Sequence, residues 1–337
     1  MTNQLSLAIQ DLKFKGLEIT AINQIVGGRN SSIYKINNAE SREHFILKLY
    51  KKPTDLDNRD RLSTEREFLN YLGNCGFQKS PNLVHFSDNN YWSLMSFIDG
   101  NKVRALNQND LHQVVKFLTS INSNEHLDAR KNLPLASEAI TSPQQIIKSV
   151  EKRFKIFQAV QPNSNEEEKI YQWINISLRP RMEIAVHELL KKQKREYWHT
   201  DDFCSHASPS DIGVHNMLRR HKELYFIDFE YAGIDDLSKC FSDLILQPEY
   251  LLTSEQEQCL LSLACSLMGI ERKQQLWLYR LEDIKPLIMI KWCLIMLKDF
   301  GTQSISQQQF HKAKDYFMLN RHLCDYPFKA RSILTNI

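Results

Sequence analysis

Three oxygen-bearing side chains lie within a short stretch of the sequence, residues 208–230. Asp211 is followed five residues later by Asn216, and Asp228 follows the apolar run 224–227. Phosphoryl transfer from a nucleotide uses such a set. One carboxylate orients the attacking hydroxyl, while an amide oxygen and a second carboxylate hold Mg²⁺ on the phosphates. The spacing therefore predicts Asp211 as the catalytic carboxylate and Asn216 with Asp228 as ligands of Mg²⁺.

Each of these three residues also has an ordinary structural interpretation. Asp211 could cap a helix, Asn216 could lie in a turn, and Asp228 could be a turn carboxylate at the end of a strand. Their order and spacing, taken together, favour an active site over three unrelated structural roles.

A lysine upstream of this set could contact the nucleotide. Lys48 lies at the end of the apolar run 45–47, and a lysine on an inner strand can bridge nucleotide phosphates when a helix carboxylate orients it. Glu65 is the expected partner because it shares a helical face with the apolar positions one and two turns later, and Glu67 is the competing candidate. The alternative interpretation of Lys48 is a surface lysine on a strand.

The segment 27–32, Gly-Gly-Arg-Asn-Ser-Ser, could fold over the phosphates. Gly27 and Gly28 permit close approach of the backbone, and the side chains of Asn30 and Ser31 can donate to phosphate oxygens. A glycine pair between strands is most often a hairpin turn. The segment is not a Walker loop, because no Gly-Lys-Ser/Thr follows it.

Histidines gather near the same region, with His199, His206 and His215 close in sequence to Asp201 and Asp202. A metal site or a general base could be built from them. Their spacing matches no known set of metal ligands, and the Mg²⁺ interpretation uses oxygen atoms instead.

Length, net charge and cysteine pattern limit the classes of protein to which the chain could belong. The chain has 337 residues, which predicts about two domains or lobes, and its 43 basic and 40 acidic residues give a net charge of +3. With no basic stripe carrying interleaved aromatics, a nucleic-acid partner is not predicted. The seven cysteines form no C-x-x-C pair, which is typical of a reducing compartment and argues against a zinc site.

Targeting signals are not evident in the sequence. The first four residues are polar and match no signal-peptide pattern, and the most apolar run, 287–297, is interrupted by Lys291 and too short to cross a bilayer. A soluble cytoplasmic protein without membrane insertion is therefore predicted.

Hydrophobic periodicity divides the chain into a strand-rich part and a helical part. Strands are predicted at 17–22, 32–36, 44–50, 82–86, 91–97 and 224–227. Helices are predicted at 64–72, 106–121, 143–157, 166–193, 256–267 and 280–300. Pro180 is expected to interrupt or bend the fourth of these helices. The pattern indicates an α+β architecture with a ligand site between its two parts.

In the order in which they occur, these residues resemble the aminoglycoside phosphotransferase and choline kinase superfamily, which shares the protein-kinase-like fold. Asp211 and Asn216 match its H-G-D-x-x-x-x-N pattern. Asp228, within Ile-Asp-Phe-Glu-Tyr-Ala-Gly, matches its metal-binding aspartate. Residues 208–216, Ser-Pro-Ser-Asp-x-Gly-x-His-Asn, resemble a bacterial branch of this superfamily. These motifs are the most specific part of a resemblance that runs in order over much of the chain.

The resemblance implies two lobes. The N-lobe, residues 1–97, would hold a small mixed sheet with one main helix. The C-lobe, residues 98–337, would be larger and mainly helical, with the catalytic loop and the acceptor pocket. Acidic side chains that could receive a cationic acceptor there are Glu183, Glu188, Asp201 and Asp202.

The resemblance also implies a nucleotide site. It places a nucleotide loop at residues 27–32, phosphate contacts at Lys48 with Glu65, and adenine contacts at Met95 and Phe97 in the interlobe linker. The implied cofactors are ATP, with GTP as an alternative, and Mg²⁺.

The implied activity is transfer of the ATP γ-phosphate to a hydroxyl of a small molecule, such as an amino sugar, an amino alcohol or a polysaccharide precursor. One departure stands out: Pro209 and Ser210 replace the His-Gly that precedes the catalytic aspartate in the family, where the histidine braces the loop. This replacement motivates a non-catalytic kinase-like module, nucleotide-binding or regulatory, as the alternative. Nucleotidyl transfer is a third hypothesis. The resemblance specifies no oligomeric state.

Overall fold

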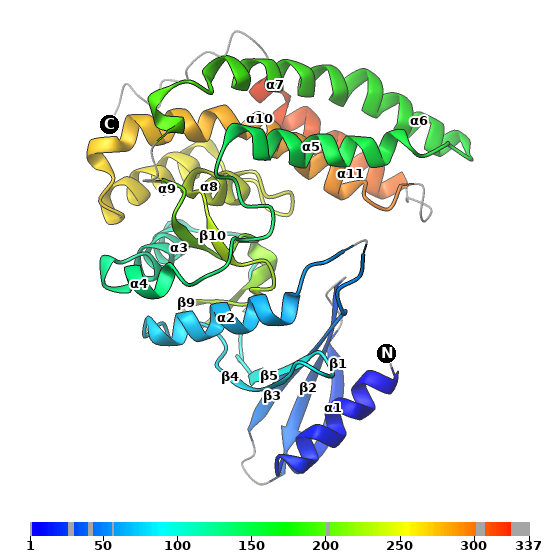
Figure 1. Ribbon diagram of the computed structural model, residues 1–337, viewed down its shortest axis with the longest axis vertical. Helices are drawn as coiled ribbons and strands as arrows, with labels where there is room; N and C mark the ends of the chain where they lie inside the picture. The colour runs from blue at the N-terminus through cyan, green and yellow to red at the C-terminus, as the bar shows by residue number, and fades with distance from the viewer. Residues whose placement is uncertain are drawn as a thin grey trace.

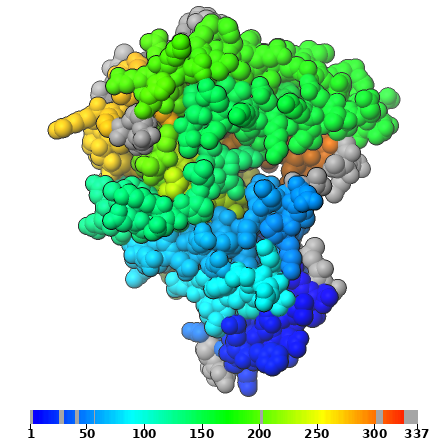
Figure 2. Space-filling model, in the orientation of Figure 1, coloured from blue at the N-terminus to red at the C-terminus, as the bar shows by residue number. Residues whose placement is uncertain are grey.

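The computed structural model describes residues 2–25, 30–39, 43–55, 57–199, 203–300 and 307–324. Figure 1 shows two lobes, with a sheet at one end of the molecule and most of the helices at the other. In the space-filling view of Figure 2, the N-terminal part, in blue and cyan, forms the narrower end of the molecule and adjoins the broader, mostly green lobe. The predicted lobe boundary after residue 97 falls between strand β5 and strand β6, and its position stays a prediction.

The smaller lobe is built on a five-stranded sheet with the order β1-β2-β3-β5-β4. Its strands are β1 Ile19–Ile25, β2 Ser31–Asn38, β3 His44–Tyr50, β4 Leu83–Ser87 and β5 Trp92–Ser96. Every neighbouring pair is antiparallel, whereas the sequence analysis expected a mixed sheet. The chain leaves β3 for the edge strand β4, and the hairpin that follows places β5 antiparallel beside β3, so this sheet contains no parallel pair.

An N-terminal helix, α1 Thr2–Phe14, was not predicted from the sequence. Its buried residues Ala8 and Leu12 pack in one cluster with Leu47 and Leu94 of the sheet. Among the described side chains of this helix, only Ala8 and Leu12 are buried, so its apolar stripe is too short to give a clear helical period in the sequence. It nevertheless covers one face of the sheet (Figure 1).

Alternation along β3 determines which side chains face the larger lobe. Leu47 and Leu49 lie in the cluster that contacts α1. Lys48 stands between them, and successive side chains of a strand point to opposite faces of the sheet. Its ammonium group therefore reaches the other face, where it contacts helix α2, Arg61–Asn74.

Helix α2 lies between the sheet and the larger lobe (Figure 1). Asp60 caps its first turn, since its carboxylate accepts from the Ser63 amide at 3.1 Å. Phe68 packs on Phe229 of the larger lobe, with ring centroids 5.2 Å apart. The helix is thereby fixed to both lobes.

The larger lobe is mainly helical. Its helices are α3 Gln108–Ile121, α4 Leu127–Arg130, α5 Pro143–Gln158, α6 Asn165–Trp173, α7 Arg179–Lys192, α8 Leu237–Ile245, α9 Ser254–Leu267, α10 Gln274–Met296 and α11 Gln307–Asn320. A π-helical turn, Ile174–Leu178, separates α6 from α7 directly before Pro180. This confirms the predicted interruption, because proline has no amide hydrogen to continue the helical ladder.

Helix α10 forms the centre of the larger lobe. Trp277, Leu281, Ile284 and Ile288 are fully buried along it, in a core shared with the helices around it. Among the residues with a described structure, no helix has both the length and the apolar character needed to cross a bilayer.

Two small sheets carry the chemistry-bearing segment. One pairs β7 His206–Ser208 with β10 Gly233–Asp235, and the other has the order β6-β8-β9, with β6 Asn101–Lys102, β8 Met217–Arg220 and β9 Glu223–Phe226. The sequence predicted β9, but β6, β7 and β10 are too short for a periodic signal.

Candidate active site

The loop that carries Asp211 runs between β7 and β8 and ends in a single helical turn, Val214–Asn216. The side-chain amide of Asn216 donates to the backbone carbonyl of Asp211 at 2.9 Å. This bond closes the loop and uses the amide nitrogen, so the amide oxygen is the atom left to bind a metal. Ser210 has a φ of 62°, a left-handed conformation that is uncommon outside glycine.

Asp228 lies directly beyond β9 and also has a left-handed backbone, with a φ of 66°. The preceding amide, of Ile227, donates to the carbonyl of Asn216 at 3.0 Å. The two predicted metal ligands are therefore held next to each other by main-chain hydrogen bonding.

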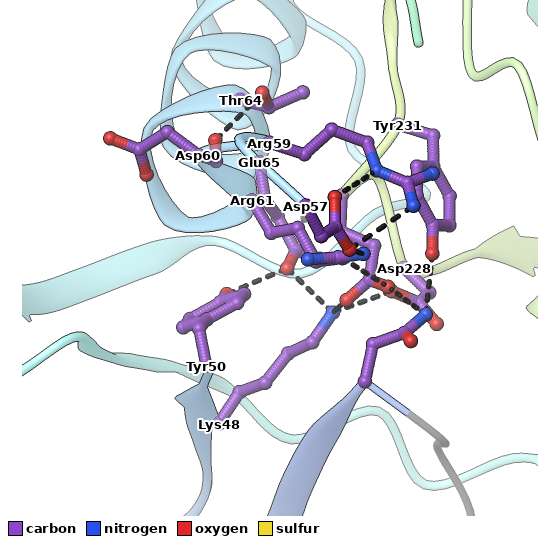
Figure 3. A network of polar contacts seen from close by, with 12 residues as sticks. Lys48, Tyr50, Asp57, Arg59, Asp60, Arg61, Thr64, Glu65, Asp228 and Tyr231 are labelled. Atoms are coloured by element: carbon purple, nitrogen blue, oxygen red, sulfur yellow. Dashed lines mark hydrogen bonds and ion pairs between the residues drawn. The ribbon is translucent and has the colours of Figure 1, made fainter. Parts of the chain in front are cut away.

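Lys48 meets three carboxylates in the cleft between the lobes, as Figure 3 shows in part. Its Nζ lies 2.7 Å from Glu65 Oε2, 2.5 Å from Asp228 Oδ1 and 3.2 Å from Glu230 Oε2. We call these four residues the cleft cluster. The predicted partner Glu65 is thus present, whereas Glu67 accepts from the Ser63 hydroxyl at 3.0 Å.

Glu65 is fixed from several sides. Its Oε1 accepts from the Phe229 amide at 3.0 Å, and its Oε2 accepts from the Tyr50 hydroxyl at 2.6 Å. The Tyr50 hydroxyl lies 2.8 Å from Ser93 Oγ on the neighbouring strand. The carboxylate therefore links the sheet, helix α2 and the segment after β9.

Burial acts on both charges of the central pair. Burial lowers the pKa of Lys48, but the Asp228 and Glu65 carboxylates outweigh this and raise the pKa well above its ordinary value. Burial raises the pKa of Glu65 by more than the Lys48 ammonium lowers it. Lys48 thus stays positively charged across the physiological pH range.

The oxygen atoms that could hold a divalent cation bound with a nucleotide are those of Asn216 and Asp228. The other two carboxylates beside Lys48 are already engaged: Glu65 binds Tyr50 and the Phe229 amide, and Arg61 lies 3.6 Å from Glu230. Asp228 keeps 33% of its side chain exposed, so its carboxylate is open to the cleft. Carboxylate and amide oxygens with access to solvent are what Mg²⁺ prefers, since it keeps some of its water and phosphate ligands.

Several residues of this site were missed by the sequence analysis. Buried Glu230 follows Asp228 by two residues, and this spacing was the available signal. Arg59 and Arg61 both pair with Asp57 at 2.6 Å, and their guanidinium groups lie over the ring of Tyr231 (Figure 3).

The residues predicted for the nucleotide loop lie in different environments or outside the described part of the chain. Gly27 and Gly28 lie outside the described residues. Asn30 donates to Glu230 at 3.0 Å and also to the Tyr231 hydroxyl, so it joins the two lobes. Ser31 begins β2, where it pairs with the end of β3. Their contacts with a nucleotide stay predictions.

Met95 and Phe97 are placed in the linker region at the end of β5. Met95 is buried against the core of the larger lobe. The ring of Phe97 lies under the Lys35 ammonium at 4.1 Å and contacts His44 edge-on at a centroid distance of 5.8 Å. A role in adenine binding stays a prediction for both.

His215 contacts the predicted catalytic residue directly. Its Nε2 lies 3.2 Å from Asp211 Oδ2, and its Nδ1 lies 3.1 Å from the Gln247 side-chain amide. Burial lowers the pKa of His215, but Asp211 outweighs this and raises it above its ordinary value. In the part of the chain that the structure describes, no cluster of three His, Cys, Asp or Glu side chains is arranged to hold a metal ion.

A surface pocket of about 400 Å³ lies elsewhere in the larger lobe, between the segment after α8 and helix α11. Its lining combines the segment after α8 with α11 and includes Pro248, Leu251, His311, Lys312, Asp315 and Tyr316. Glu249 lies between the first two of these residues, and its Oε2 is 3.7 Å from His215 Nδ1. Of the acidic residues predicted for an acceptor, Glu183 and Glu188 are not among the lining residues: Glu188 pairs with Lys191 at 2.8 Å on α7, and Glu183 is exposed on the same helix. Asp201 and Asp202 lie outside the described residues.

Solved structures of small-molecule kinases resemble this chain over most of its length. An ethanolamine kinase from Plasmodium vivax matches with a TM-score of 0.60 and 14% identity, over 94% of this chain and 84% of its own. A choline/ethanolamine kinase family protein from Mesorhizobium loti matches with a TM-score of 0.60 and 14% identity, over 94% and 92%. An ADP-bound aminoglycoside phosphotransferase matches with a TM-score of 0.58 and 15% identity, over 95% and 99%.

The fold is therefore the bilobal α+β fold of the protein-kinase-like proteins. No family model matches the sequence. No curated protein matches it at a significant level. Identities of 14% to 15% establish the architecture and leave the reaction to be argued from the site itself.

Proposed function

We propose that the protein is an ATP- and Mg²⁺-dependent phosphotransferase that moves the γ-phosphate to a hydroxyl of a small molecule. The observation that carries the proposal is the meeting of Lys48, Glu65 and Asp228 in one cleft, beside the loop of Asp211 and Asn216. These residues come from distant parts of the sequence, and a structural role requires no such convergence. Membership of the aminoglycoside phosphotransferase and choline kinase superfamily is part of the proposal.

Each residue has a defined task in this reaction. Lys48, oriented by Glu65, binds the α- and β-phosphates, and its fixed positive charge matches the negative charge of the triphosphate. Asn216 and Asp228 would hold Mg²⁺, which when bound neutralises charge on the phosphates. Asp211 accepts a hydrogen bond from the acceptor hydroxyl and takes its proton as the new oxygen–phosphorus bond forms. Most of the rate enhancement comes from positioning and charge neutralisation.

The acceptor is proposed to bind at the pocket beside Glu249. The pocket presents Lys312 and Asp315 on α11. Glu249, which follows the lining residue Pro248 in the chain, lies 3.7 Å from His215, and His215 contacts Asp211. A cationic or zwitterionic small molecule, such as an amino alcohol or amino sugar, would find a carboxylate partner there.

Calorimetric titration with ATP, in the presence of Mg²⁺ or EDTA, tests the nucleotide site. The wild type is expected to bind MgATP with a Kd in the micromolar to sub-millimolar range, and Asp228→Ala or EDTA should weaken binding at least tenfold. Asp128→Ala is the matched control, because its carboxylate is 96% exposed and lies far along the chain. Failure of the wild type to bind under any metal condition would favour a non-catalytic module.

The reaction is then tested with a metabolite screen that follows ADP release and product mass. Phosphorylated product is expected, and Asp211→Asn should lower turnover at least a hundredfold while MgATP affinity is kept. Adenylylated product would show nucleotidyl transfer instead.

A further inference from the structure

Gly213 makes room for the contact between His215 and Asp211, although the backbone conformation at this position does not require a glycine. Gly213 has φ −115° and ψ 166°, an extended conformation open to every residue type. A Cβ atom at this position would lie 2.5 Å from Cε1 and 2.6 Å from Nδ1 of the His215 ring. The missing side chain therefore serves to make room for the imidazole.

The other side of the ring is also fixed. Gln247, which follows α8, is buried and its side-chain amide lies 3.1 Å from Nδ1 of His215. When this amide donates, Nδ1 is the acceptor and the ring hydrogen must lie on Nε2. That hydrogen points at Asp211 Oδ2, 3.2 Å away. Glu249 is the charged group near the same nitrogen, with Oε2 at 3.7 Å.

A hydrogen bond to one oxygen of Asp211 leaves the other oxygen for the substrate. Asp211 lies on a loop with 29% of its side chain exposed, so its carboxylate needs an external contact to hold one orientation. The histidine that braces the loop in the superfamily that this chain resembles is replaced here by Pro209. His215 contacts the carboxylate itself, from four residues further along the chain.

We propose that His215 is a positioning residue that orients the Asp211 carboxylate, and that Gly213 and Gln247 hold its ring for this task. The inference rests on the proposed function. With Oδ2 bound by His215, Oδ1 accepts the hydroxyl proton as the oxygen–phosphorus bond forms and the bond from the γ-phosphorus to ADP breaks. Loss of the ring leaves the aspartate present but free to rotate, which lowers turnover without removing the nucleotide site.

Steady-state hydrolysis of MgATP by the full chain, with water in place of the acceptor, measures this effect. His215→Ala is expected to lower kcat about tenfold with KM for MgATP changed less than twofold. His215→Gln places an amide donor near the position of Nε2 and should recover most of the loss. Unchanged kcat in His215→Ala, or equal losses in the Ala and Gln variants, would overturn the inference.

A double-mutant cycle separates positioning from folding. Gly213→Ala should lower kcat about as much as His215→Ala, because its Cβ displaces the ring, and adding it to His215→Ala should cause little further loss. Additive losses would contradict the proposed coupling. Nitrogen chemical shifts of the neutral His215 ring give a readout without turnover: the Nε2–H tautomer is expected in the wild type and a mixture of tautomers in Gln247→Leu.

The two proposals fail in different ways. A wild type that neither binds nor hydrolyses MgATP overturns the proposed function and this inference with it. A wild type that hydrolyses MgATP while His215→Ala matches it overturns the inference and leaves the proposed function standing.

Discussion

The cleft cluster around Lys48 and a second group of charges in the larger lobe are both buried, but they differ in balance and in access. In the cleft, one ammonium group faces the carboxylates of Glu65, Asp228 and Glu230, and Asp228 is open to solvent. Negative charge is in excess where a cation and a polyphosphate are proposed to bind.

The second group, which we call the core network, consists of Lys239, Lys291, Asp235 and Asp243. Lys239 lies 2.6 Å from Asp235 and 3.2 Å from Asp243, and Lys291 lies 2.8 Å from Asp243. Each of these side chains is at most 6% exposed. Two ammonium groups meet two carboxylates, so the charges are balanced.

Charge balance and access to solvent determine what the buried charges do in each group. A balanced and enclosed group contributes to structure, since removing one member leaves another uncompensated. A group with excess charge and an open side can gain a partner from solution. Lys239 Nζ also lies 3.4 Å from Ser210 Oγ, so the core network lies directly behind the loop of Asp211.

The strongest test of this contrast is to remove Lys239. Lys239→Met should lower the free energy of unfolding by about 3–5 kcal/mol, because Asp235 and Asp243 lose a buried partner. Urea unfolding measures the change, and adding Asp235→Asn to the same chain should recover part of it. A loss below about 1 kcal/mol would contradict the structural role of the core network.

A substitution in the cleft cluster is expected to change MgATP binding more than the free energy of unfolding. Glu65→Gln should weaken MgATP binding about tenfold, or about 1.4 kcal/mol, because Lys48 loses its orienting charge. The free energy of unfolding should stay within about 1 kcal/mol, since Gln avoids the burial of a carboxylate. Glu67→Gln, on the same helix, is the control and should alter neither quantity; equal effects from both substitutions would contradict the assignment.

Protonation of Asp243 in acid is expected to lower the free energy of unfolding by a smaller amount. Burial raises the pKa of Asp243, but Lys291 and Lys239 outweigh this and hold it below its ordinary value of 3.8. Its stabilising contribution is therefore complete above the ordinary pKa and is lost as the pH falls through the lowered pKa of the folded state. Unfolding followed at about pH 4 and about pH 3 should show a loss about 1 kcal/mol smaller in Asp243→Asn than in the wild type. An equal loss in Asp243→Asn and in the wild type would contradict this assignment.

The sequence predicted the parts of the site that depend on local pattern. Strand β3 was placed at its observed bounds, and alternation along it explains why Lys48 reaches Glu65. The order of Asp211, Asn216 and Asp228 indicated one site, and the structure brings their segments together.

The remaining features depend on contacts between distant residues, which periodicity does not reveal. His215 was considered as part of a metal or base site, and its pairing with Asp211 depends on the space at Gly213 and on Gln247. Glu230 joins Asn30 across the two lobes, a pairing that follows from tertiary packing.

Helix α1 influences the position of Lys48 through the strand on which the helix packs. By providing an apolar partner for Leu47 and Leu49, it favours one register of β3 over a slip by a single residue. Such a slip would turn Lys48 into the apolar layer and a leucine into the cleft. A helix of thirteen residues thereby helps to fix the register of the strand that carries Lys48.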